Sequence, residues 1–198
     1  MQGSAAAEVE NDAVGGILPT EHVDWSRALR MIGLVGLLGV VPASLLPGAL
    51  VAGEVGGLVL LMTPLLALGA VFGYGRSQPA GTVSSAGGTR MGALLGLWMG
   101  ALTAAITGVA GYVLRYGYHS RAMDEKMDQA VALMPAQLQA AGSPPPPELL
   151  AFLHTPEFRA GTFILGHVFT VLLLVAAGSV CGWMAATMLR ARRQRNID

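Results

Sequence analysis

Three ionisable side chains lie within or beside long apolar stretches of the sequence, where such groups are costly and commonly functional. Glu54 is the only charged residue in residues 31–75, and His167 is the only histidine in the charge-free residues 160–189. Arg115 follows a third charge-free stretch. The sequence predicts a polar cluster of Glu54, Arg115 and His167. In the alternative interpretation, Glu54 and Arg115 face headgroups or water, and His167 is hydrogen-bonded to a neighbouring backbone or hydroxyl group.

His167 is also the one candidate for binding a metal-centred pigment at membrane depth. A bis-histidine haem would need a second histidine within the apolar stretches, but His22, His119 and His154 all fall outside them. A pigment with one axial ligand is compatible with the sequence but has nothing else to support it. We therefore predict no cofactor and no metal site.

The motifs of common enzymes are missing from the sequence. It has no dinucleotide-binding glycine motif after a strand, no phosphate loop, no His-Glu-x-x-His and no Gly-x-Ser-x-Gly. Ser84 and Ser85 lack the base that a nucleophile requires. A single cysteine, Cys181, excludes an internal disulfide and a cysteine-based zinc site. The sequence predicts a protein that is not an enzyme.

The elements that carry these residues follow from the composition. Only 12% of the residues are charged, whereas 53% are hydrophobic, and the net charge of +0 argues against nucleic-acid binding. A membrane-spanning helix needs about 20 apolar residues. The sequence therefore predicts an all-α integral membrane protein, in which four transmembrane helices form a bundle. The predicted spans are residues 28–47, 53–75, 91–114 and 160–189.

The remaining segments complete the predicted domain organisation. Residues 1–26 form a disordered tail, residues 27–193 a single four-helix membrane domain, and residues 194–198 a second tail. If the N-terminus is cytoplasmic, eight of the 12 basic residues lie on the cytoplasmic face and four on the other. The positive-inside rule then predicts a multi-pass membrane protein with both termini in the cytoplasm.

Residues 116–159 are too polar to cross a membrane and form the predicted outer loop between helices three and four. From Ala122 the loop is expected to be an amphipathic helix that ends before Pro144, and a short helix follows from Glu148. Its apolar stripe either covers the bundle and the membrane surface or forms a docking surface for a partner. The residues of this stripe are Met123, Met127, Val131, Met134 and Leu138.

Small residues recur every four positions on the third and fourth predicted helices. In lipid, such rows allow two helix backbones to approach closely, as in a glycine zipper. The sequence does not say whether the partner helix belongs to the same chain or to a second copy. The predicted packing residues are Gly92, Gly96, Gly100, Ala104 and Gly108 on the third helix, and Gly178, Gly182 and Ala186 on the fourth.

Several short motifs occur in an order found in one family. The chain resembles, over residues 28–193, a large bacterial family of uncharacterised four-helix membrane proteins that is known only as a domain of unknown function. The resemblance implies the four-helix fold and a location in the bacterial inner membrane. Members often carry a carboxylate near the start of the last helix, where this chain has Gly166-His167-Val168-Phe169. The shared motifs are Glu54-x-x-Gly57, Met62, Gly-Tyr-Gly-Arg at 73–76, Met-Asp-Glu at 123–125 and Ala-Gly-Ser at 141–143.

Two classes of function remain after these exclusions. The first is an accessory or assembly subunit of a membrane complex, with lipid and either a membrane-protein partner or a second copy as its contacts. The second is a small transporter or channel, formed by one chain or by a dimer, that uses Glu54 and His167 along its pathway. Secondary transporters commonly have internal repeats and pairs of broken helices. The sequence shows neither feature, which argues against a secondary transporter.

Overall fold

The computed structural model describes residues 23–45, 55–78, 83–140, 142, 146–153 and 155–195. These residues form helices and short turns, with no strand among them. The elements are α2 (Trp25–Leu45), α4 (Val55–Ser77), α5 (Ser85–Tyr112), the π-helical turn η1 (Val113–Gly117), α6 (Ala122–Ala140), α7 (Pro147–Leu153) and α8 (Pro156–Arg195).

Four of these helices are long and apolar enough to cross a membrane, which confirms the prediction of four such helices: α2, α4, α5 together with η1, and α8. Pro42 and Pro64 lie inside α2 and α4, which continue through them. Thr155 starts α8, because its hydroxyl accepts a hydrogen bond from the Phe158 amide at 3.2 Å. Gly142 has φ +80°, the left-handed conformation that commonly follows a helix C-terminus.

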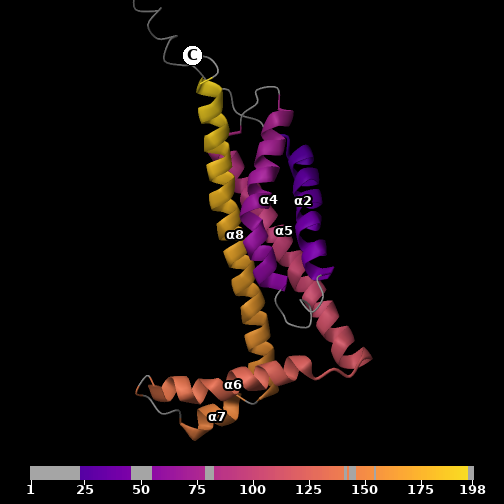
Figure 1. The fold of residues 1–198 in the computed structure, drawn as a ribbon, viewed down its shortest axis with the longest axis vertical. Coiled ribbons are helices and arrows are strands. Elements are labelled where there is room, and N and C mark those ends of the chain that lie inside the picture. Colours follow the sequence, from indigo (N-terminus) through magenta and orange to yellow (C-terminus); the bar gives the residue numbers. More distant parts are fainter. Residues whose placement is uncertain are drawn as a thin grey trace, which may run out of the picture.

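The long helices lie side by side, and α6 and α7 lie across one end of them (Figure 1). Helix α8 contacts α5 and α4, and α2 contacts α4 and α5. We call the end at which α2 begins and α8 finishes the tail end, and the opposite end the arm end, after the arm formed by α6 and α7. Of the predicted apolar stripe in the arm, Val131 is buried and Met134 and Leu138 are partly buried, whereas the side chains of Met123 and Met127 lie outside the described residues.

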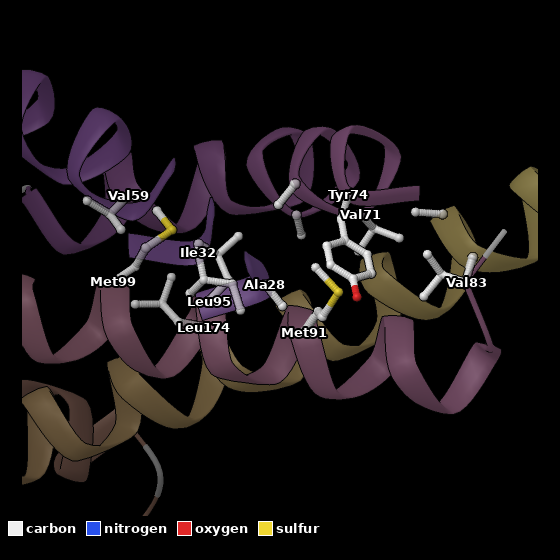
Figure 2. Packing of buried hydrophobic residues seen from close by; sticks show 14 of the residues in the cluster. Ala28, Ile32, Val59, Val71, Tyr74, Val83, Met91, Leu95, Met99 and Leu174 are labelled. Carbon is white, nitrogen blue, oxygen red and sulfur yellow. The ribbon is translucent and has the colours of Figure 1, made fainter. Parts of the chain in front are cut away.

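The hydrophobic core lies between the long helices toward the tail end. Met91, Leu95 and Met99 of α5 point into it, as do Tyr74 and Val71 of α4 (Figure 2). Leu174, Ala185 and Leu189 of α8 also belong to this core, but no residue before Leu174 on α8 is fully buried. Packing on α8 is therefore concentrated in its second half.

Helices α5 and α8 approach most closely where glycines replace larger side chains. A Cβ atom on Gly92 would overlap the Gly178 carbonyl, and one on Gly88 would lie 2.5 Å from the Gly182 carbonyl oxygen. Gly96 faces the backbone at Leu174 in the same way. The two helices run in opposite directions in backbone contact, and both belong to the same chain. Gly108, in contrast, has no atom within 4 Å of an added Cβ, so it takes no part in this backbone contact.

The contacts also show how far α4 extends along α8. A Cβ on Gly56 would lie 3.4 Å from Thr170 Cγ2, and one on Gly75 would lie 2.7 Å from Leu189 Cδ1. Helix α4 therefore covers α8 from about the level of Thr170 to that of Leu189. Residues 156–169 of α8, and the part of α5 beyond Gly100, continue past the beginning of α4 (Figure 1). We call these two stretches the arm-side segments of α5 and α8.

The same contacts give the position of Arg90 along the bundle axis relative to α8. Arg90 lies between Gly88 and Gly92, which face Gly182 and Gly178, so it is level with about residue 180 of α8. That level is close to the middle of the length of α8 that α4 covers. The predicted spans 53–75 and 91–114 are consequently offset along the bundle axis by several residues, and α4 reaches less far toward the arm end than α5.

Candidate functional site

The predicted polar cluster has two members within the described residues, Arg115 and His167. Arg115 belongs to η1, and its Nη1 lies 3.5 Å from Asp124 Oδ1. His167 Nε2 lies 2.8 Å from the Thr107 hydroxyl, eight residues or about 12 Å before Arg115 along the same helical rod. Arg115 and His167 thus have separate partners. Glu54, the third member, lies outside the described residues.

The hydrogen bonds of His167 define its tautomer when the ring is neutral. His167 Nδ1 lies 2.9 Å from the Phe163 carbonyl oxygen, and because a carbonyl can only accept, Nδ1 carries a hydrogen. In the neutral ring Nε2 then accepts from the Thr107 hydroxyl. The same hydroxyl lies 2.7 Å from the Thr103 carbonyl oxygen and has one hydrogen to share between these two acceptors. His167 and Thr107 therefore form a polar bridge between the arm-side segments.

The arm is attached to the long helices by charged groups. Arg159, in the first turn of α8, lies 3.9 Å from Asp124 and donates to Asp128 through Nη2. Asp124 also faces Arg115, so it joins η1, α6 and α8. The Arg159 Nε is buried and has no hydrogen-bond partner within the part of the chain that the structure describes. Two guanidinium groups and two carboxylates balance each other in this cluster.

The tail end is joined by hydrogen bonds between helices. The Asp24 amide donates to the Tyr74 hydroxyl at 2.8 Å, and Arg27 donates to the Ser77 carbonyl at 3.2 Å. Arg190 Nε donates to the Val83 carbonyl, also at 3.2 Å. The Asp24 carboxylate accepts from the Ser26 hydroxyl and from the Arg27 amide, and these hydrogen bonds hold the pKa of Asp24 below its ordinary value.

A shallow, widely open apolar depression of about 490 Å³, which we call the cleft, lies between Phe152 of α7 and one face of the first turns of α8. Its wall includes Phe152 and Phe158, whose rings pack edge to face with centroids 5.5 Å apart. A Cβ on Gly161 would meet no atom within 4 Å, which leaves the cleft open on the α8 side. The remaining lining residues are Glu157, Thr162, Ile164, Leu165 and Val168.

Sequence reasoning did not identify Thr107, Arg159 or Gly88 as contact residues. Thr107 stands one residue before Gly108 in the predicted small-residue row, and its pairing with His167 depends on the register of α5 against α8. Gly88 lies four residues before Gly92 and extends the same row in the other direction. Arg159 could have been found because it is a lone cation at the start of an apolar helix, opposite an acidic first turn of α6.

No group of three or more His, Cys, Asp or Glu side chains that could hold a metal ion occurs among the described residues. Cys181 is a free, partly buried thiol on α8. The chain has no significant match among protein-family models, curated proteins or solved structures. The site is therefore characterised by its own contacts: a polar bridge, a charged attachment of the arm and an apolar cleft.

Proposed function

We propose that the protein is a non-enzymatic accessory or assembly subunit of a bacterial inner-membrane complex, and that a partner helix docks against its arm-side segments. The observation that carries this proposal is that α5 and α8 continue past the beginning of α4 with no further long helix of the described residues beside them (Figure 1).

The first support for the proposal comes from comparing two placements of the hydrocarbon core along the bundle axis. If the hydrocarbon core covered only the length of α4, Arg90 would lie near its middle, at a cost of about 2.5–3.5 kcal/mol. Exposed apolar residues of α8, such as Leu165 at 68% and Phe169 at 60%, would then lie in water. If the core instead lies between the levels of Arg90 and Arg115, Arg90 leaves its middle and the arm-side residues of α8 enter it. Trp183, Met184 and Met188 of α8, which are 51%, 39% and 46% exposed, then lie on its cytoplasmic side. Arg90 and Arg115 are 25 positions apart, or about 37 Å along the helix, which is sufficient for a core of about 30 Å.

In this placement both termini are cytoplasmic and the arm lies at the outer surface. Helix α4 then begins near the middle of the hydrocarbon core, since Gly56 and Gly100 lie against neighbouring residues of α8, Thr170 and Val171. Of the helices that the structure describes, α5 and α8 cross the outer half. Gly108 and Gly166 in the arm-side segments have no atom within 4 Å of an added Cβ. Because small residues allow helices in lipid to pack closely, these two positions leave space for a partner helix.

A photo-crosslinking experiment tests the proposal. A photoreactive amino acid at Val109, which is 65% exposed on the arm-side segment of α5, should form one defined adduct with another membrane protein in intact cells. The same amino acid at Leu61, which is 76% exposed on α4, serves as the control and should give only lipid adducts. Lipid adducts alone at Val109, or the same protein adducts at both positions, would contradict a docking role for the arm-side segments.

The polar bridge favours a second candidate function, a small transporter or channel that uses Glu54 and His167. In the placement above, His167 lies within the outer half of the hydrocarbon core, where ionisable groups commonly mark transport pathways. Flux measurements on proteoliposomes distinguish this candidate. A proton or cation flux that the protein increases, and that is lost in His167→Ala or Glu54→Gln, would support transport over an accessory role.

A further inference from the structure

The cleft between α7 and α8 lies at a defined depth in the membrane placement described above. Glu157 and Val168 mark its two ends along α8, eleven residues or about 16 Å apart. Glu157 is two residues from Arg159, in the layer where the arm is held by ion pairs, and Val168 lies close to the level at which α4 begins. The cleft thus extends over about the thickness of one leaflet's hydrocarbon region, which is about 15 Å.

The lining of the cleft matches an amphiphile rather than a polar solute. Phe152, Phe158 and Ile164 contribute apolar walls, and Leu165 and Val168 continue them toward the membrane centre. Polar side-chain groups among the lining residues are the Thr162 hydroxyl and the Glu157 carboxylate. The carboxylate is exposed at the end nearest the ion-pair layer and has no ion pair among the described residues.

We propose that this cleft binds one phospholipid of the outer leaflet with an ammonium-bearing headgroup, such as phosphatidylethanolamine. One acyl chain lies along Gly161, Leu165 and Val168, and the ammonium group donates hydrogen bonds to the Glu157 carboxylate. The carboxylate attracts the ammonium of a zwitterionic headgroup, whereas in an anionic lipid the phosphate charge has no ammonium to compensate it and is repelled. This inference depends on the membrane placement but not on a partner protein.

Two glycines of α8 provide a matched pair of variants for testing the acyl-chain site. Gly161 lines the cleft and Gly166 does not, while neither has an atom within 4 Å of an added Cβ. Purified protein in mild detergent is titrated with phosphatidylethanolamine, and bound lipid is counted by native mass spectrometry. We expect one retained lipid in the unaltered chain and in Gly166→Leu, and at least a tenfold weaker retention in Gly161→Leu, because its side chain fills the cleft.

The headgroup contact has a separate test. In Glu157→Gln, the preference for phosphatidylethanolamine over phosphatidylglycerol with the same acyl chains should fall at least threefold, while acyl-chain binding persists. Equal lipid retention in Gly161→Leu and Gly166→Leu would overturn the proposal. A chain that binds no lipid but forms a dimer that Gly161→Leu disrupts would overturn it too, since the cleft would then hold a second copy. Both outcomes leave the crosslinking test of the accessory role unaffected.

Discussion

Helices α5 and α8 form two different kinds of contact along one pair of helices. Toward the tail end, Gly88, Gly92 and Gly96 bring the backbones into direct contact, and α4 and α2 complete a core around them. Toward the arm end the helices carry large exposed apolar side chains, and the polar bridge of Thr107 and His167 connects them. The two halves have similar apolar composition, so composition does not explain the difference.

The difference between the tail-side and arm-side contacts indicates which contacts stabilise the fold. Without a hydrophobic driving force between helices in lipid, close packing is the main source of association. Close packing is available only where glycines face each other in register, which occurs in the tail-side half. The arm-side half retains an exposed surface that can accept lipid or protein without disturbing the packed core.

The largest expected effect comes from adding one methyl group to each half. Gly92→Ala places a Cβ against the Gly178 carbonyl and should destabilise the fold by at least about 3 kcal/mol, because backbone atoms must move apart. Gly108→Ala adds the same atom in open space and should leave stability unchanged within about 0.5 kcal/mol. Reversible unfolding in mixed detergent micelles measures both, and equal losses would show that the two halves do not differ in packing.

Much of this comparison could be predicted from the sequence. The charge-free stretches predict four apolar helices, and the four-residue spacing from Gly92 to Gly100 identifies the face of α5 that contacts α8. How far along that row the backbone contact continues could not be predicted. It depends on the angle between the two helices and on the turn of about 40° that each four-residue step makes around a helix. The position of α4 along the bundle axis relative to α5 and α8 could not be predicted either. The charge-free stretches give the length of each helix, but no local signal gives the offset between two helices.

The polar bridge should have a smaller effect than the glycine contact. Hydrogen bonds between helices in a membrane contribute about 0.6 kcal/mol on average, with a maximum of about 1.7. A double-mutant cycle of Thr107→Val and His167→Phe should therefore give a coupling free energy of about 0.5–1.5 kcal/mol. A cycle that pairs Thr170→Val with His167→Phe is the control, since the Thr170 hydroxyl donates to the Gly166 carbonyl instead. Zero coupling in the first cycle would mean that the bridge contributes nothing.

The ion pairs of the arm should contribute less again. Asp128→Asn weakens the contact with Arg159, whose side chain is 30% exposed, and pairs of this exposure contribute about 0.2–1 kcal/mol. We expect faster amide hydrogen exchange in α6 and a smaller difference between low and high salt. Glu125→Gln removes a charge from the same helix without breaking an ion pair among the described residues, and should change exchange little. Similar acceleration in both variants would rule out a specific role for Asp128.

The smallest effect is expected at Asp24, at the tail end. Its pKa is lowered below the ordinary value of 3.8 in the folded chain, so its carboxylate stabilises the fold above that pH. The contribution is lost as the pH falls through the folded pKa. Asp24→Asn keeps an acceptor for the helix N-terminus but does not titrate. Unfolding midpoints compared between about pH 6 and about pH 3 should fall slightly more for the unaltered chain than for Asp24→Asn. Parallel curves would contradict this assignment.

Helix α8 runs without interruption for 40 residues, about 60 Å, from the arm to the tail end. Its contacts with α4 extend from Thr170 to Leu189, so α8 is held along that length and residues 156–169 project about 21 Å from it toward the arm. A force on the arm therefore acts on a rod that is fixed at one end, and its first support is at Thr170 and Val171, which Gly56 and Gly100 face. The hydrogen bond from Arg190 to Val83 and the position of Arg192, 5.9 Å from the Phe72 ring, add further contacts near the opposite end of the same helix.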